Sequence, residues 1–170
     1  MRRCRGANPD AAGATFSVWA PYGGTAVVHL ADGPAAGDHA MARAATRASS
    51  ASHGDDARDI FTVHVPGARA GDRYGFRLDG GAPLPDPASR SQPDGVHGLS
   101  QVVDPGRFVW HDAHWTGVAL RDFVLYELHV GTFTADGTFD AVAARLPELD
   151  ALGVTAVELM PVAEFPGRRN

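Results

Sequence analysis

The sequence predicts two folded parts in succession, a β-sandwich followed by the beginning of an α/β domain with a parallel sheet. Short segments that alternate apolar and polar residues recur up to about residue 80, which is typical of a sandwich. The character changes at Arg121, after which two nearly continuous apolar runs flank a segment with helical periodicity. Runs of this kind are typical of strands buried on both faces of a parallel sheet.

Composition narrows the class of protein. The 170 residues are 44% apolar and 21% charged and include 20 glycines and 12 prolines, as in a globular protein with many loops. The net charge of −5 gives no general attraction to nucleic acid. No run approaches the roughly 18 apolar residues of a membrane span. The amino terminus lacks the apolar segment of a secretion signal. Cys4 is the single cysteine and cannot form an internal disulfide. We expect a cytoplasmic protein without a membrane partner, a metal or a cofactor.

The first part is predicted over residues 1–105. Two short strands lie within residues 14–30, separated by a turn at Pro21 and the glycine pair that follows. Two more strands are expected at residues 60–66 and 73–78, where apolar and polar residues again alternate.

Three irregular segments interrupt or follow these strands. Residues 41–59 are rich in Ala, Ser and Arg without a period, which predicts a flexible insertion, with a short helix as the alternative. Four prolines between residues 83 and 93 preclude a helix or a central strand there. After one further possible short strand near residue 102, residues 106–121 are predicted to be an aromatic linker.

Residues 122–170 predict a strand, a helix and a second strand. Thr138 is a good N-cap for the helix, and Phe139, Val142, Leu146 and Leu149 recur at helical spacing. Pro147 is expected to kink or restart that helix, and Gly153 to end it. A strand–helix–strand unit of this length requires a parallel pair. Since one helix leaves the other sheet face uncovered, we expect the chain to stop within this domain.

Three stretches resemble a known family. They are FSVWAP from Phe16, LPDPASRSQPDGVHGLSQVVDP from Leu84, and FVLYELHVGTFTADGTFDAV from Phe123 together with the segment 151–170. They resemble the malto-oligosyltrehalose trehalohydrolases among the alpha-amylase-type glycoside hydrolases, over residues 14–30 and 60–170. Branching and debranching relatives share the YELHVG pattern more loosely.

The resemblance implies an amino-terminal immunoglobulin-like β-sandwich and then the first strand, helix and second strand of a (β/α)₈ barrel. It also implies a retaining hydrolase that releases trehalose from maltooligosyltrehalose, an α-glucan substrate. Nucleophile and acid, about 5 Å apart in such enzymes, would lie on later strands. We therefore assign no catalytic residue here, expect this chain to be inactive alone, and identify no substrate contact, although loops 131–137 and 162–170 would border the sugar site. The alternatives are a branching or debranching enzyme and a stand-alone glycan-binding sandwich.

Several residues invite a sharper interpretation. Glu127 and His129, two apart on a strand, could be an acid/base pair, but a buried hydrogen-bonded pair is favoured, and Glu158 is treated in the same way. A metal site in the segment WHDAHW is disfavoured against an exposed aromatic loop, because two histidines three apart lack a third fixed ligand. Trp110, Trp115, Trp19 or Tyr22 could stack on a sugar, although Trp19 is expected in the core.

Two further motifs give little indication of a functional site. The glycines of GDRYGFRLDGG, from Gly71, do not make a phosphate loop, since the strand–loop–helix context is missing. Arg168 and Arg169 could hold a carboxylate or simply end a solvated loop.

Overall fold

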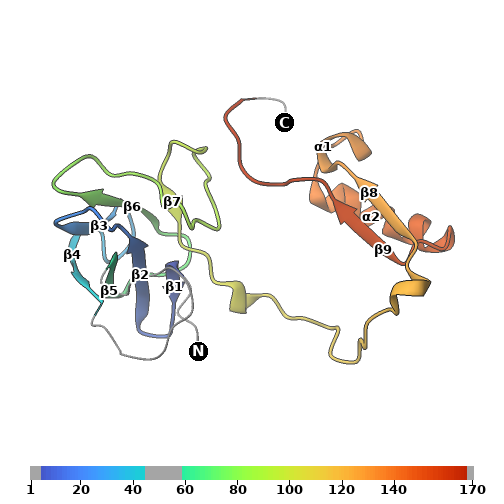
Figure 1. The fold of residues 1–170 in the computed structure, drawn as a ribbon, viewed down its shortest axis with the longest axis horizontal. Helices are drawn as coiled ribbons and strands as arrows, with labels where there is room; N and C mark the ends of the chain where they lie inside the picture. Colours follow the sequence, from blue (N-terminus) through green and yellow to red (C-terminus); the bar gives the residue numbers. More distant parts are fainter. Residues whose placement is uncertain (1–4, 45–58, 168–170) are drawn as a thin grey trace. The chain divides into compact units, whose positions relative to one another are not determined.

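A computed structural model describes residues 5–44 and 59–167 (Figure 1). The chain divides into two compact units, one built mainly from residues up to Phe108 and the other spanning Val109–Ala163. The helices of the described residues all fall short of the length and apolar character that crossing a bilayer requires.

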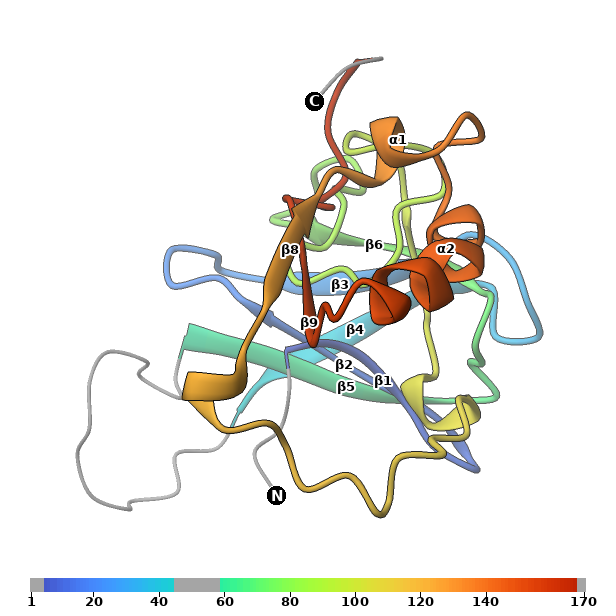
Figure 2. The ribbon, with the colours of Figure 1, turned by 90° about the vertical axis from the view of Figure 1, so that its right-hand side faces the viewer.

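The first unit is a seven-stranded antiparallel sheet with the order β1-β2-β5-β4-β3-β6-β7, which curves into a sandwich or half-barrel (Figure 2). Its strands are β1 Gly6–Pro9, β2 Gly13–Trp19, β3 Ala26–Leu30, β4 Gly37–Arg43, β5 Ile60–Pro66, β6 Arg73–Leu78 and β7 Ser100–Gln101. The predicted alternation in β2, β5 and β6 is confirmed, because one side of each strand supplies the core.

The core of this unit is apolar and centred on three aromatic rings. Tyr74 packs edge-on against Phe16, with ring centroids 5.1 Å apart, and against Phe76, at 5.8 Å. All three rings are buried, together with aliphatic side chains of β2, β3 and β5. Full burial of an aromatic or aliphatic side chain stabilises a fold by about 1.5–3 kcal/mol, so this cluster is the main source of stability of the unit.

Two strands differ from the sequence prediction. Strand β1 was not predicted, since its residues GANP carry almost no β-branched or aromatic signal and it forms only by pairing with β2. Residues Met41–Arg43 belong to β4 instead of the expected insertion, because Met41 is buried and pairs with Ala26. The remainder of that predicted insertion, from residue 45 to 58, lies outside the described residues.

The turn after β2 does not join two neighbouring strands of a β-hairpin. Strands β2 and β3 are not neighbours in the sheet, since β2 lies between β1 and β5 whereas β3 lies between β4 and β6. The turn therefore carries the chain from one half of the sheet to the other. Strand β4 links these halves because it pairs with both β3 and β5.

As predicted, the proline-rich segment forms neither a helix nor a central strand, and turns bend it after Asp86 and after Gln92. Leu84 forms an isolated antiparallel bridge to Phe76, with both backbone hydrogen bonds at 2.9 Å. The possible strand near residue 102 is the two-residue β7, which ends just before Val102. Two short 3₁₀ turns follow, η2 Pro105–Arg107 and η3 Leu120–Asp122.

The second unit has the predicted strand–helix–strand order, with β8 Leu125–Leu128, α2 Phe139–Ala151 and β9 Ala156–Leu159 (Figure 2). Strands β8 and β9 are parallel, with Leu128 opposite Leu159. Residues 131–137 were expected to form only a loop, but they include most of a single helical turn, α1 Val130–Phe133, which packs Phe133 edge-on against Tyr126. That tertiary ring contact has no local sequence signal.

Helix α2 begins and ends where its sequence predicts. Thr138 accepts a hydrogen bond from the Ala141 amide at 3.2 Å, and Gly153 adopts φ +87° after the helix. The Gly153 amide donates to the Asp150 carbonyl and the Val154 amide donates to the Leu149 carbonyl. These two hydrogen bonds are the pattern of a Schellman motif.

Pro147 does not restart α2, which runs as one continuous helix from Phe139 to Ala151. The residues around Pro147 are exposed, so water can satisfy the carbonyl that the missing amide leaves unpaired. Of the predicted apolar stripe, Val142 and Leu149 are buried against Leu128, while Phe139 and Leu146 remain 56% and 41% exposed.

Candidate functional site

A buried polar group fastens the proline-rich segment to the sheet of the first unit. The Asp86 carboxylate is only 3% exposed; its Oδ2 accepts the Tyr74 hydroxyl at 2.6 Å and its Oδ1 accepts the Ala88 amide at 2.8 Å. The Asp86 amide in turn donates to the Ser100 hydroxyl at 2.9 Å. Every part of this group is therefore hydrogen-bonded, as buried polar groups must be.

Burial shifts the pKa values of Asp86 and Tyr74. It raises the pKa of Asp86 above the usual 3.8, although the Tyr74 hydroxyl and the Ala88 amide act in the opposite direction. Burial, followed by the charge of Asp86, also raises the pKa of Tyr74. The tyrosine is accordingly the donor in the short bond between them. Sequence inspection did not single out Asp86, and its only signal was a carboxylate enclosed by two prolines in LPDP.

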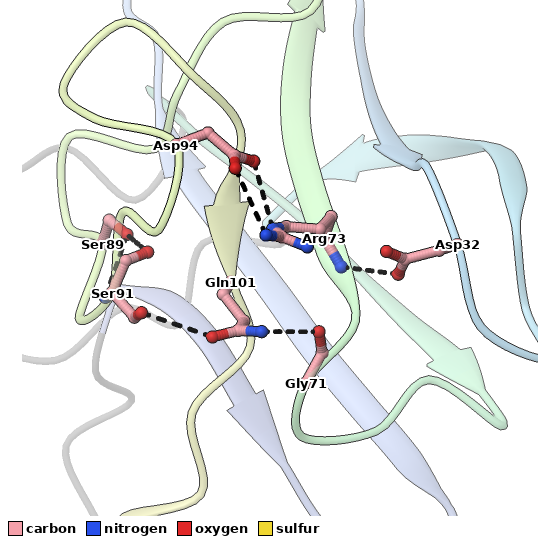
Figure 3. A network of polar contacts seen from close by, with 7 residues as sticks. All are labelled: Asp32, Gly71, Arg73, Ser89, Ser91, Asp94 and Gln101. Atoms are coloured by element: carbon pink, nitrogen blue, oxygen red, sulfur yellow. Dashed lines mark hydrogen bonds and ion pairs between the residues drawn. The ribbon is translucent and has the colours of Figure 1, made fainter.

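The loop after Asp86 is held by a second polar network, shown in Figure 3. Arg73 of β6 pairs with Asp94 through Nε and Oδ2 at 3.2 Å, while its backbone amide donates to Asp32 at 2.8 Å. Gln101 donates to the Gly71 carbonyl at 2.9 Å and accepts from the Ser91 hydroxyl at 3.4 Å. The contacts of Arg73 with Asp94 and of Gln101 with Ser91 hold the loop to β6 and β7.

Beside Asp86 the surface is hollowed. The hollow has a volume of about 180 Å³ and is lined by Arg5, Ser17, Val18, Trp19, Asp86, Pro87 and Ala88. Trp19 is 44% exposed, so the expectation that it belongs to the core is wrong. It is the last residue of β2, where the strand leaves the core and the alternation that buries Val18 turns Trp19 outward.

The carboxyl ends of β8 and β9 are the second place to seek a site, because ligands of parallel sheets bind there. Glu127 lies opposite Glu158 in the parallel register. Both face away from α2, since the alternating Leu128 packs against that helix. Both are exposed, which contradicts their interpretation as buried groups.

His129 does not share the strand with Glu127. Strand β8 ends at Leu128, and His129 caps α1 instead. Within the described residues no hydrogen bond joins it to Glu127, and the His129 Nδ1 is buried without a hydrogen-bond partner. The structure therefore supports neither an acid/base pair nor a hydrogen-bonded structural pair.

The segment WHDAHW is exposed in the structure, including His111, Asp112 and His114. Across residues 5–44 and 59–167, no three His, Cys, Asp or Glu side chains gather in a way that could hold a metal ion. Trp110 and Trp115 are each 72% exposed, and Tyr22 is 98% exposed at the turn after β2. Arg168 and Arg169 lie outside the described residues.

Comparison with known proteins identifies the family. No family model matches the chain. A malto-oligosyltrehalose trehalohydrolase of Saccharolobus solfataricus is 42% identical over 161 residues, which are 95% of this chain and 26% of that protein. The trehalohydrolase of Deinococcus radiodurans is 53% identical over 111 residues, or 65% of this chain and 18% of that protein. This chain thus spans about a quarter of the length of such relatives.

A solved structure extends the comparison to the fold. A Salmonella typhimurium protein provisionally named an alpha amylase superposes with a TM-score of 0.81 and 39% identity, covering 99% of this chain and 26% of that one. The chain corresponds to the amino-terminal region of the malto-oligosyltrehalose trehalohydrolase family.

Proposed function

We propose that this chain is part of a glycoside hydrolase that cleaves the α-1,4 bond next to the terminal trehalose unit of a maltooligosyltrehalose. The observation that carries the proposal is the 42% identity to a trehalohydrolase across 95% of the chain. The substrate would be a neutral α-glucan. The compartment proposed is the cytoplasm.

In this proposal the first unit is an immunoglobulin-like domain, and β8, α2 and β9 are the first strand, helix and strand of a (β/α)₈ barrel. The parallel register and the helix on one face support it. So does the exposure of apolar side chains in and before β8, where Val124 and Leu125 are 52% and 57% exposed. Each would contribute about 1.5–3 kcal/mol if further strands and helices buried it.

The face of β8 and β9 that carries Glu127 and Glu158 would then be the barrel interior, because the helices of such barrels lie outside. The two side chains sit on adjacent strands in register, so a closed barrel would bring a charged pair into its centre. Such a pair requires cationic or hydrogen-bonding partners. We assign them a positioning role and place the nucleophile and the acid on strands beyond residue 170.

The test is trehalose release from a maltooligosyltrehalose, measured with the purified 170-residue chain beside the same chain extended through its natural coding sequence. We expect release only by the extended protein. Release by the short chain would refute the assignment, and Glu127→Gln and Glu158→Gln would then show whether its own carboxylates do the chemistry. Transfer of glucan branches without trehalose release would replace the proposed substrate class.

A further inference from the structure

We propose that Asp136 is a site of spontaneous isoaspartate formation, a covalent modification of the main chain, and that it thereby becomes a substrate for an isoaspartyl methyltransferase. The sequence contains four Asp-Gly pairs, which begin at Asp32, Asp79, Asp94 and Asp136. A glycine leaves the approach to its backbone nitrogen open, so this modification is fastest where glycine follows an aspartate. The reaction takes place within one chain and does not depend on the proposed function.

The reaction is an exchange of bonds that consumes no oxidant and no cofactor. The Gly137 nitrogen attacks Cγ of Asp136 and forms a C–N bond, while the nitrogen proton leaves with the carboxyl hydroxyl as water. The product is a succinimide ring. Water then adds to one of its two carbonyl carbons and breaks the bond from that carbon to nitrogen. When the former main-chain carbonyl is the one released, the main chain runs through Cβ and Cγ, which is isoaspartate.

Three of the four carboxylates are anchored to distant parts of the first unit. Asp32 accepts a hydrogen bond from the Arg73 amide at 2.8 Å, and Asp94 pairs with the Arg73 guanidinium, with Nε and Oδ2 3.2 Å apart (Figure 3). The Asp79 carboxylate accepts from two backbone amides of the turn after β2, at 2.9 and 2.8 Å. Attack on Cγ requires the carboxyl group to turn toward the next nitrogen, so each anchor must break before the ring can close.

The Asp136 carboxylate lacks such an anchor. It is exposed, and within residues 5–44 and 59–167 no group hydrogen-bonds to it or forms an ion pair with it. The attacking nitrogen is restrained instead, because the Gly137 amide donates to Thr134 Oγ1 at 3.1 Å. A hydrogen bond between two neutral groups is weaker than one to a carboxylate, so this restraint opposes the reaction less than the anchors of the first unit do.

The chain contains a matched comparison, because the tripeptide Ala-Asp-Gly occurs at residues 31–33 and again at residues 135–137. Asp32 and Asp136 are both exposed, so neither the tripeptide nor access to water distinguishes them. The Arg73 amide holds the first carboxylate, and the second is unanchored. We expect about ten times as much isoaspartate at residue 136 as at residue 32, the factor that one hydrogen bond to a charged group gives.

The modification would fall where the main chain is closely packed. Gly137 has φ +62°, and a Cβ there would lie 3.1 Å from the Gly131 carbonyl oxygen. Isoaspartate at residue 136 adds one methylene to the main chain just before Thr138, whose side chain caps α2. The cap should therefore be displaced, and amides in the first turn of α2 should exchange faster in modified molecules than in unmodified ones.

We would incubate the 170-residue chain for several weeks in neutral buffer made with H₂¹⁸O, then digest it and measure isoaspartate and ¹⁸O in each Asp-Gly peptide by mass spectrometry. Each succinimide that opens takes one oxygen from the solvent. Methyl transfer from S-adenosylmethionine by a purified isoaspartyl methyltransferase gives a second readout. Asp136→Glu is the matched control, because it keeps the charge but would have to close a less favourable six-membered ring. It should remove most of the methyl transfer.

Two further measurements test whether the anchors cause the difference. In urea the anchors are lost, so residues 32 and 136 should react at similar rates. Arg73→Gln removes the guanidinium from Asp94 but keeps the backbone amide that holds Asp32, so isoaspartate should rise at Asp94 and not at Asp32. Equal isoaspartate at residues 32 and 136 of the folded chain would overturn the proposal. A tenfold difference between them that persists in urea would overturn it as well, because the tertiary structure would then not be its cause.

Discussion

Replacing Tyr74 with phenylalanine would remove a single hydroxyl from the buried polar group that fastens the proline-rich segment to the sheet. The ring contacts with Phe16 and Phe76, at centroid distances of 5.1 and 5.8 Å, would remain. The change therefore isolates the hydrogen bond of 2.6 Å from the hydroxyl to the Asp86 carboxylate.

The expected cost follows from the burial of both partners. A hydrogen bond to a charged group contributes about 1.5–3 kcal/mol, and Asp86 at 3% exposure cannot regain it from water. We expect the free energy of unfolding of the first unit to fall by about 2 kcal/mol. For a domain of 60–100 residues, 1 kcal/mol lowers Tm by about 4–8 °C, so Tm should fall by about 8–16 °C.

The cost should depend on pH in a definite direction. The pKa of Asp86 is raised by burial and held down in part by the Tyr74 hydroxyl, so removing the hydroxyl raises it further. A folded state with a raised carboxyl pKa holds its proton more tightly than the unfolded state. Stability is then lost as the pH rises from about 3.8 through the folded pKa, and more of it is lost in the variant. The loss should be larger at pH 7 than at pH 3.

The assay is urea unfolding of the 170-residue chain at pH 3 and pH 7, followed by near-ultraviolet circular dichroism. Tyr22→Phe is the matched control, because Tyr22 is 98% exposed and its hydroxyl is in water. A Tyr74→Phe variant as stable as Tyr22→Phe at pH 7, or one with a greater loss at pH 3, would refute the reasoning.

Three further outcomes are expected. Gly33→Ala should destabilise the first unit by about 1–3 kcal/mol, since Gly33 has φ +81° and a Cβ would lie 2.4 Å from Asp72 Oδ1. The control is Gly67→Ala, because Gly67 also has a positive φ but a Cβ there would meet open space. Equal losses of stability for the two variants in thermal unfolding would contradict the steric argument. Thr138→Ala should lower the stability of α2 by about 1 kcal/mol and be rescued by Thr138→Ser, as measured by amide exchange. Limited proteolysis should cut the second unit, Val109–Ala163, before it cuts the first unit. Among the described residues, the core of the second unit holds three buried apolar side chains, whereas the core of the first unit holds fifteen. A second unit that stays protected from the protease would contradict this expectation.

Some features of this protein are determined locally and could be predicted from the sequence. The bounds of α2 depend on Thr138 at one end and Gly153 at the other, and both act through hydrogen bonds within a few residues. The alternation in β5 and β6 predicts which side chains enter the core, because successive residues of a strand face opposite sides. The resemblance to trehalohydrolases could likewise be recognised from the sequence alone.

Other features were decided by partners distant in the chain. Met41 belongs to a strand because Ala26 lies opposite it, and β1 exists because β2 provides a hydrogen-bonding edge. The exposure of Glu127 depends on which elements cover β8, and nothing in its neighbouring residues reports that.

The hollow beside Trp19 shows the same division most clearly. Its tryptophan and its carboxylate are 67 positions apart in the numbering, at 19 and 86, and only the folding of the proline-rich segment against β6 brings them together. Sequence periodicity reports the face on which a side chain lies relative to its neighbours along the chain. Burial and proximity depend on what packs against that face, which is a property of the tertiary structure alone.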